Sequence, residues 1–317
     1  MKIGLYLAVL TVLIGLAVGI PATFGPEPSA EASRAQQLVT RDYGSADVGQ
    51  SSVAAVPAGE TVMRMLQREF AVETRFGGGF VQSIEGRAGG RRDGRPIDWF
   101  YYVNGIEASV GAATRDVAAG DRIWWDLHDW GTITRVPAVV GSFPEPFLSG
   151  IEGKRRPVRI DCSETAARLC DEVTTRLDEA GITAVARSAL NGPAGSELLR
   201  IVVGPWDEVR RDPTLRQLER APRSSGVFAR FLDSGRRLEL YDATGRVERT
   251  LGAGTGLIAA TRFEGQQPTW VVTGTDAAGA AAAATAMREE TLSRRFALAV
   301  QEGRPVSVPI DPPDGSP

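Results

Sequence analysis

One aromatic segment decides the fold of the first half of the chain: Ile97-Asp98-Trp99-Phe100-Tyr101-Tyr102-Val103-Asn104-Gly105. Aromatic and β-branched residues favour strands, and Asn-Gly is a turn signal, so this segment predicts a strand that ends in a tight turn. Successive side chains of a strand point to opposite faces. One face therefore carries Ile97, Trp99, Tyr101 and Val103, and the other carries Asp98, Phe100, Tyr102 and Asn104.

A second aromatic strand is predicted over residues 121–130, directly after the turn residues Ala119-Gly120. Seven of the 22 aromatic residues of the chain fall between positions 99 and 130. Ile123, Trp125 and Leu127 share one face, which we expect to pack on a helix. The opposite faces of both strands form a candidate ligand-binding surface, called the aromatic face below, with the residues Phe100, Tyr102, Asn104, Trp124, Asp126, His128 and Trp130.

A sheet face with this many rings is not expected to remain in water unless something covers it. Flat rings with hydrogen-bonding groups between them suit a planar macrocycle, a sugar or a partner protein. Two alternatives stay open: the face is covered permanently by residues 136–147 or by the following domain, or it belongs to an ordinary core. His128, beside Asp126 and Asp129, could ligate cobalt or sense pH; a hydrogen-bonded structural role is the alternative.

Residues 35–135 are predicted to form a small α+β domain. A helix is expected over residues 60–70, because Val62, Met65, Leu66 and Phe70 recur at helical spacing. Strands are expected at residues 38–39 and 80–84, and residues 86–95, with four glycines and four arginines, are expected to form an exposed loop. One helix on a mixed sheet predicts a β-grasp-like fold.

The rest of the chain is predicted to hold a linker, a second domain and a tail. Residues 136–157 contain four prolines and several glycines, which is typical of a linker that crosses a surface. Residues 158–310 are predicted to form a mixed α/β sandwich domain, and residues 311–317 a disordered tail. We expect helices over 165–180 and within 276–300, and strands at 158–161, 182–187, 198–203, 227–232, 237–241, 257–262 and 269–273.

Residues 1–34 have the pattern of an export signal and spacer. Lys2 is followed by an apolar stretch over residues 3–20, and then by prolines and the small residues Ala30 and Ala32. A positive start, an apolar middle and an Ala-x-Ala site describe a secretory signal peptide. The apolar stretch is long enough that an uncleaved signal anchor is the alternative. Either interpretation predicts a protein that is secreted or anchored to the outer face of the cytoplasmic membrane.

Two cysteines, Cys162 and Cys170, are expected in an oxidising compartment, where a structural disulfide can form. If both lay in one helix, eight residues would separate them by about 12 Å, which is beyond disulfide reach. A disulfide therefore requires Cys162 to lie in a turn that folds back on a helix starting near Thr165. Two buried thiols are the alternative.

Composition argues against catalysis and against nucleic-acid binding. The 317 residues include 43% hydrophobic and 24% charged residues, enough for ordinary cores, and the formal net charge is −3. That charge offers no broad basic field for nucleic acid. A single histidine and two cysteines leave little for a metal site, and we find no Gly-x-Ser-x-Gly, His-Glu-x-x-His or paired-cysteine pattern. We therefore expect no enzyme and no metal centre.

Four segments of residues 35–131 resemble the C-terminal domain of transcobalamin and intrinsic factor and its stand-alone bacterial relatives. They are the helix 62–66, the strand and turn 80–86, the aromatic strand 99–105 and the closing strand 120–125, which reads Gly120-Asp121-Arg122-Ile123-Trp124-Trp125. The resemblance implies a β-grasp-like fold. In the transcobalamins this domain caps cobalamin held against a helical barrel, whereas here a mixed α/β domain follows it. A separate helical-barrel partner would have to complete such a site. The second domain resembles no family that we can name, and its pairing with the first resembles actinobacterial envelope proteins.

These observations predict an exported, non-catalytic binding protein of the bacterial cell envelope. It would present the aromatic face to a ligand, or to a ligand-holding partner of an uptake system. The ligand that the resemblance implies is a corrinoid such as cobalamin, and no other cofactor is expected. The alternative is a structural or interaction module that binds an envelope polymer or another protein; an enzyme in the second domain comes third. We expect membrane contact only through the N-terminal segment.

Overall fold

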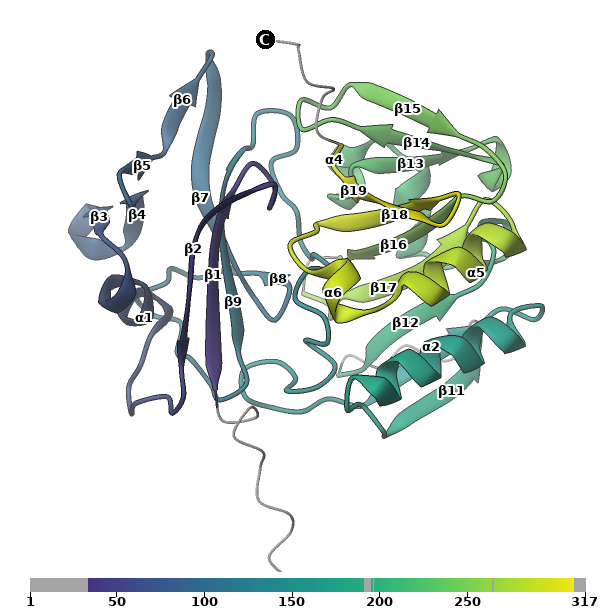
Figure 1. The fold of residues 1–317 in the computed structure, drawn as a ribbon, viewed down its shortest axis with the longest axis horizontal. Coiled ribbons are helices and arrows are strands. Elements are labelled where there is room, and N and C mark those ends of the chain that lie inside the picture. The colour runs from purple at the N-terminus through teal and green to yellow at the C-terminus, as the bar shows by residue number, and fades with distance from the viewer. Residues whose placement is uncertain (1–33, 191–194, 196, 264, 311–317) are drawn as a thin grey trace, which may run out of the picture.

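The computed structural model describes residues 34–310, except residues 191–194, 196 and 264. The predicted signal or anchor segment up to residue 33 and the predicted tail 311–317 lie outside the described residues. Within them, the chain forms an N-terminal body and an α/β body, which lie side by side (Figure 1). Both combine helices with mixed sheets, which confirms the predicted α+β fold class.

The N-terminal body is built on a mixed sheet with the strand order β2-β1-β9-β7-β6, in which β8 also pairs with β7. Its strands are β1 (Ala35–Arg41), β2 (Ala46–Val53), β6 (Gly90–Arg92), β7 (Arg95–Val103), β8 (Ile106–Glu107) and β9 (Arg122–Asp129). Only β1 and β9 pair in parallel among these described strands. The two predicted aromatic strands, β7 and β9, are neighbours in the middle of this sheet.

One helix, α1 (Val62–Glu69), covers one face of this sheet. Thr61 caps its N-terminus, because its side chain accepts a hydrogen bond from the backbone N–H of Arg64 at 3.2 Å. Met65 and Leu66 are buried against Trp125 and the other residues that the alternation assigned to this face. A small separate sheet follows the helix, with β3 (Val72–Arg75), β4 (Phe80–Ile84) and β5 (Arg87–Ala88). The predicted exposed loop therefore contains two short strands, β5 and β6.

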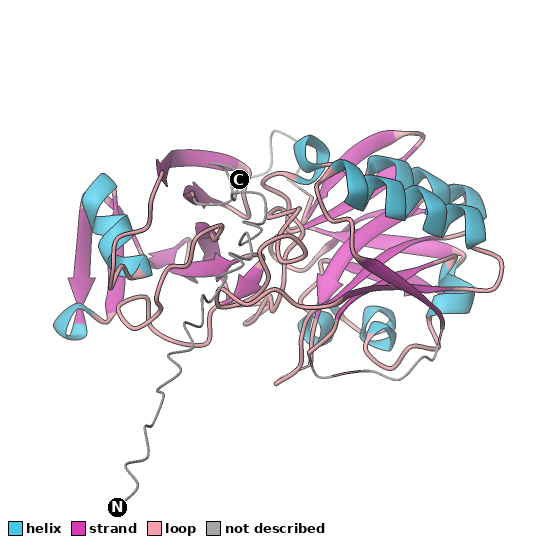
Figure 2. Cartoon of the chain, turned by 90° about the horizontal axis from the view of Figure 1, so that it is seen from below, coloured by secondary structure: helices cyan, strands magenta, loops and turns pink. Residues whose placement is uncertain are grey.

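The α/β body contains a seven-stranded sheet with the order β11-β10-β12-β17-β16-β18-β19. Its strands are β10 (Val158–Cys162), β11 (Val185–Ala189), β12 (Leu199–Val203), β16 (Gly256–Thr261), β17 (Thr269–Gly274), β18 (Ala297–Gln301) and β19 (Arg304–Val308). Helices α2 (Ala167–Glu179) and α5 (Ala277–Ala286) pack on one face. Figure 2 shows these helices along one side of the sheet and many loops where the two bodies meet.

The other face of the large sheet packs on a smaller sheet and short helices. The smaller sheet has the order β13-β14-β15, formed by β13 (Ala229–Leu232), β14 (Arg237–Tyr241) and β15 (Val247–Leu251). The short helices there are α3 (Trp206–Val209) and α4 (Pro222–Ser225). A third short helix, α6 (Glu289–Leu292), lies near the N-terminal body (Figure 1) and packs Leu292 into the core on the α2 and α5 side of the sheet. Cys162, at the end of β10, and Cys170, in α2, form a disulfide with 6.2 Å between their Cα atoms.

Two parts of the chain differ from the sequence-based expectations. The helix predicted within residues 276–300 is present as α5, but the same range also runs into a strand that was not predicted, β18, at residues 297–301. A short apolar run cannot be assigned to helix or strand from periodicity alone. The predicted surface linker is largely interior: Val139 is buried in the core that the two bodies share, and Val140 and Phe143 are buried in the core of the α/β body.

Candidate functional site

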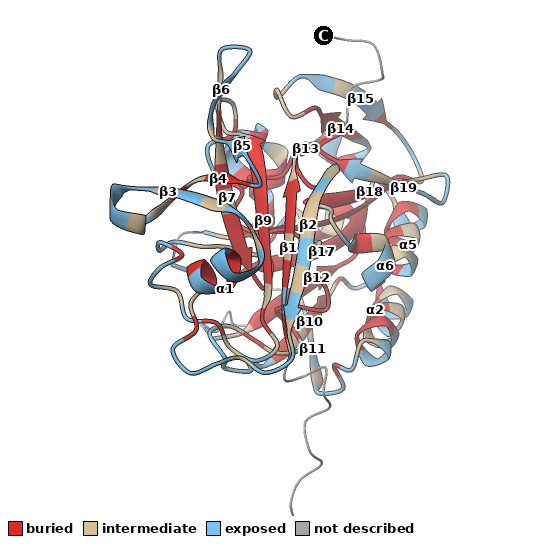
Figure 3. Cartoon of the chain, turned by 60° about the vertical axis from the view of Figure 1, so that its left-hand side comes forward, coloured by how far each residue is buried: buried red, intermediate tan, exposed pale blue. Residues whose placement is uncertain are grey.

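The aromatic face lies against the α/β body. Tyr102 and Trp124 are 0% and 2% exposed, in a core that also contains Phe228 and Phe296 of the α/β body. The ring centroid of Phe296 lies 5.0 Å from that of Trp124 and 5.6 Å from that of Tyr102. Figure 3 shows β9 and the facing strands of the α/β body as buried. The face is therefore an interface between the two bodies, which was the first alternative to a ligand site.

His128 is buried within this interface. Its ring stacks between those of Tyr43 and Phe100, with centroid distances of 4.5 Å to each, and meets Phe296 edge-on. Its Nδ1 lies 2.8 Å from Oδ1 of Asp126, a hydrogen bond in which the imidazole donates. Packing against three rings, a hydrogen-bonded partner and an exposure of 3% give His128 the structural role.

Asp126, on β9, accepts hydrogen bonds from the end of β1 and from the turn that follows it. It is fully buried and accepts from Oγ1 of Thr40 at 2.5 Å and from the backbone N–H groups of Tyr43 and Gly44 at 3.0 and 2.9 Å. Thr40 in turn accepts a hydrogen bond from the indole of Trp124 at 2.7 Å. These bonds fix the turn after β1 against β9, so the carboxylate serves the fold.

The three remaining residues of the aromatic face also have internal partners. Asn104 is buried; its amide donates to Asp121 and to the carbonyl of Gly150, both at 2.9 Å, and accepts from the N–H of Arg122. Trp130 is half-buried, and its indole donates to Asp98 at 2.9 Å. Phe100 is half-buried and stacks on His128.

The prediction that the aromatic face meets a ligand is therefore wrong for Tyr102, Asp126 and His128, because packing or a polar partner covers each of them. Asn104 and Trp124 are also buried, but each borders one of the two grooves described below.

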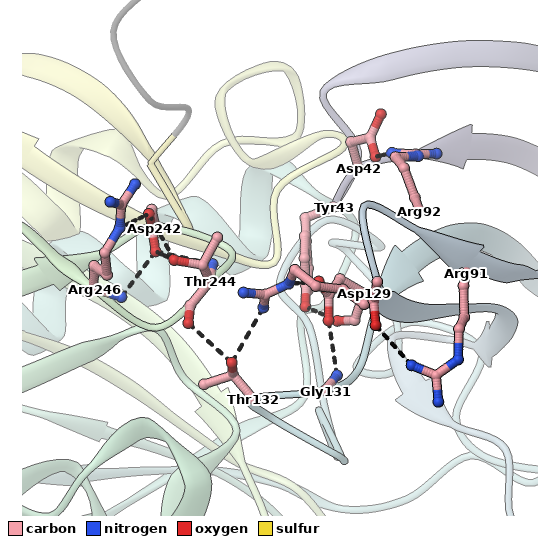
Figure 4. A network of polar contacts seen from close by, with 12 residues as sticks. Asp42, Tyr43, Arg91, Arg92, Asp129, Gly131, Thr132, Asp242, Thr244 and Arg246 are labelled. Carbon is pink, nitrogen blue, oxygen red and sulfur yellow. Dashed lines mark hydrogen bonds and ion pairs between the residues drawn. The ribbon is translucent and has the colours of Figure 1, made fainter. Parts of the chain in front are cut away.

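Polar contacts continue this interface toward the turn between β14 and β15 (Figure 4). Arg95 pairs with Asp129 and donates to the hydroxyl of Thr132 at 3.1 Å. Thr132 donates to the carbonyl of Thr244 in the α/β body at 2.9 Å. The hydroxyl of Tyr43 donates to the carbonyl of Asp129 at 2.5 Å, and burial, aided by Asp126, raises the pKa of Tyr43 far above its usual range. The network holds the end of β9 to the second body.

One groove, called the amide groove below, lies along β1, β2 and α6, beside the interface. It encloses about 460 Å³. Strand pairing and alternation place Gln36, Gln50 and Ser52 on the face of the sheet that borders it. Arg122 at its wall pairs with Glu289 of α6 at 2.7 Å. The described lining is Arg34, Gln36, Gln37, Leu38, Gln50, Ser51, Ser52, Arg122, Ile123, Trp124, Gly141, Ser142, Glu289, Ser293 and Arg294.

A second groove, called the arginine groove below, lies between the N-terminal body, the connecting segment and the loop after β16. It encloses about 490 Å³, and four arginines line it: Arg115, Arg135, Arg156 and Arg262. Asn104 is the one aromatic-face residue in this lining, and Trp124 is the one in the amide groove. These arginines cannot be recognised as a group in the sequence, because they come from separate segments without a shared motif.

Neither a metal centre nor a membrane-spanning helix is found within the described part of the chain. No three His, Cys, Asp or Glu side chains there are grouped so as to hold a metal ion. No helix among the described residues is long and apolar enough to cross a membrane.

Comparison with known proteins gives one family match. Residues 59–129, from just before α1 to the end of β9, match the family described as a domain of unknown function (DUF4430). A crystal structure of a "putative metal binding protein" from Ruminococcus gnavus aligns with 31% of this chain and 97% of its own, at 15% identity and a TM-score of 0.26. No curated protein matches the chain. The α/β body lies outside the family match.

Proposed function

We propose that this chain is an exported, non-catalytic binding protein of the bacterial cell envelope, and that it holds a hydroxyl-rich ligand in the amide groove. A segment of an envelope polysaccharide is the ligand class that fits this groove. The proposal rests on the groove itself, which encloses about 460 Å³ and lies between two bodies that share a core. Ligand sites have volumes of roughly 300–1,000 Å³.

The chemistry of the lining favours sugar hydroxyls. A hydroxyl both donates and accepts, and so do the glutamine amides and serine hydroxyls at this site. Gln36, Gln50 and Ser52 are exposed on neighbouring strands, so they are free to reorient toward a ligand. Arg34, Arg122 and Arg294 outnumber the one acidic residue of the described lining, Glu289, which suits a polymer that carries acidic groups. Arg122 pairs with Glu289 and Arg294 pairs with Asp47, so Arg34 is the cation of this lining for which no ion pair is found among the described residues.

Two features support an extracytoplasmic location. Residues 1–34 have the pattern of a signal peptide or anchor, and Cys162 and Cys170 are disulfide-bonded. Disulfides persist in secreted proteins and are rare in the cytosol. The proposal therefore places both bodies on the outer side of the cytoplasmic membrane, where an envelope polymer is available.

A sedimentation assay tests this proposal. We expect the protein to sediment with purified peptidoglycan sacculi, and oligosaccharides released from the sacculi to compete. The double variant Gln36→Ala, Gln50→Ala should bind at least about tenfold more weakly, because it loses two hydrogen-bonding side chains. The matched control Gln266→Ala, Gln267→Ala removes the same chemistry from the arginine groove and should bind normally. Equal binding by all three proteins, or none by the wild type, would contradict the proposal.

Capture of a corrinoid is a second proposal, favoured by the family match over residues 59–129. That match covers all four segments that resemble the transcobalamin domain. Because the aromatic face is covered, the corrinoid would bind elsewhere on this domain, together with a helical-barrel partner. Titration with cobalamin, in the presence of a candidate partner and followed by tryptophan fluorescence, tests it; an unchanged signal removes this proposal and leaves the first untouched.

A further inference from the structure

The arginine groove collects positive charge from three separate parts of the chain. Arg115 comes from the N-terminal body, Arg135 and Arg156 from the ends of the connecting segment, and Arg262 from the loop after β16. The described lining contains two acidic residues, Glu107 and Glu152. A ligand in this groove would contact both bodies at once.

Two of these guanidinium groups are largely removed from water. The side chains of Arg115 and Arg156 are 16% and 17% exposed. Taking a cation out of water is costly unless an anion and several hydrogen bonds replace its hydration. The partners of these two arginines therefore decide whether the groove is already balanced.

Arg115 has only weak compensation. It donates to the backbone carbonyl of Asp116 at 2.8 Å, and the nearest carboxylate oxygen with which it pairs, on Asp121, is 4.0 Å away. That carboxylate already accepts hydrogen bonds from Asn104 and from the N–H of Ala118, both at 2.9 Å. Arg115 thus has room for a stronger anionic partner.

Arg156 is similarly incomplete. It pairs with Glu197, whose side chain is 64% exposed and lies outside the groove lining. Its Nε–H group is shielded from solvent and has no hydrogen-bond acceptor among the described residues. A buried donor without an acceptor is unfavourable, so the fold maintains an uncompensated group at this wall.

The acid inside the groove does not cancel the charge. Glu107 pairs with Arg135 at 3.0 Å, and its backbone carbonyl accepts a hydrogen bond from Arg262 at 3.1 Å. Burial raises the pKa of Glu107 above its usual value, although the hydrogen bond and the charge of Arg135 act in the opposite direction. In the described lining, four arginines therefore outnumber two carboxylates.

We propose that the arginine groove is a second binding site, distinct from the amide groove, for a small organic polyanion that presents two or more carboxylate or phosphate groups. Guanidinium groups bind both kinds of oxyanion in bidentate fashion. The anion would bridge Arg115 and Arg156, accept from the Nε–H of Arg156, and join the two bodies. The lining residues of the two grooves do not overlap, so each site can be tested alone.

Calorimetric titration with two probes, citrate and pyrophosphate, tests this inference on the whole chain at constant ionic strength. We expect at least one of them to bind and to raise the thermal midpoint, as any ligand of the native state does. The probe that binds shows whether the groove takes a polyanion with carboxylate groups or one with phosphate groups. Arg156→Gln should weaken binding at least about tenfold, and the exposed Arg249→Gln, a matched control on β15, should bind as the wild type does.

Each outcome decides for or against the site. Loss of binding in Arg156→Gln with retention in Arg249→Gln supports it, and Arg115→Gln replaces Arg156→Gln if the latter does not fold. Failure of both probes to bind the wild type overturns the inference, as does equal weakening by the groove and control variants. Sedimentation with sacculi is independent of these results, because it depends on the other groove.

Discussion

Asp126 shows how a residue that suggests a ligand site can serve the fold. Its two oxygens accept from Thr40, Tyr43, Gly44 and His128, all between 2.5 and 3.0 Å. A buried carboxylate is tolerated when donors surround it in this way. The sequence places Asp126 and His128 on one face of a strand, but it does not show which groups complete their environment.

Replacing Asp126 should therefore destabilise the protein strongly. Asp126→Ala leaves several buried donors without an acceptor, and we expect the free energy of unfolding to fall by about 3–5 kcal/mol. The matched control is Asp47→Ala, which removes an exposed carboxylate paired with Arg294 and should cost less than about 1 kcal/mol. Urea unfolding measures both. Similar losses of stability in the two variants would show that Asp126 is not the acceptor of these buried hydrogen bonds.

Glu145 should give the protein a distinctive pH dependence. Burial raises its pKa above the usual 4.5, so the folded state holds this proton more tightly than the unfolded chain does. Protonated Glu145 therefore stabilises the folded protein at pH values below the pKa that this group has in the unfolded chain. This stabilisation is lost as the pH rises through the higher pKa of the folded state. Glu145→Gln cannot ionise and keeps an oxygen for the N–H of Ser149.

Unfolding measured from acid to neutral pH should thus show a smaller loss of stability in Glu145→Gln than in the wild type. The exposed Glu152→Gln is the control and should follow the wild-type slope. A wild-type slope in Glu145→Gln would mean that this carboxyl group titrates alike in the folded and unfolded states.

At the scale of elements, α5 shows how small residues set a packing distance. This helix is almost entirely alanine, and it lies against β16 and β17. A Cβ atom added at Gly279 would lie 2.2 Å from the backbone carbonyl oxygen of Thr255. The absence of a side chain at this position lets helix and strand approach, so the choice of glycine is steric.

This contact reverses the usual effect of a glycine-to-alanine change in a helix. Alanine is favoured over glycine by about 1 kcal/mol in a helix interior, but Gly279→Ala must push α5 away from a backbone atom. We expect a net loss of stability of about 1–3 kcal/mol. The exposed Ala278→Gly is the control and should lose about 1 kcal/mol through propensity alone. A gain of stability in Gly279→Ala would contradict the close approach.

The sequence predicts elements better where periodicity is clear. The aromatic strands β7 and β9 and the helix α1 follow from alternation and from helical spacing. Strand β18 does not, because its buried run Ala297-Leu298-Ala299-Val300 fits either structure. Strand β2 carries few apolar residues, so it has no alternation to detect. Its residues line the amide groove only because β2 pairs with β1 in the folded sheet, and the sequence of β2 does not indicate this pairing.

At the scale of the whole molecule, the two bodies share one hydrophobic core. Tyr43 and Trp124 from the N-terminal body, Val139 from the connecting segment, and Phe228 and Phe296 from the α/β body belong to it. The sequence predicts that something covers the aromatic rings, but the covering residues lie far along the chain. The arginines of the second groove are likewise brought together only by the docking of the bodies, so both grooves depend on this arrangement.

The most direct test of this shared core uses His128, the only histidine of the chain. Because its ring is buried between Tyr43 and Phe100, diethyl pyrocarbonate should leave it unmodified in the native protein. After denaturation in urea the reagent should modify it fully, as read by mass spectrometry of the peptide that contains it. Rapid modification of His128 in the native protein would contradict the account, because it would show that the aromatic face is open to solvent.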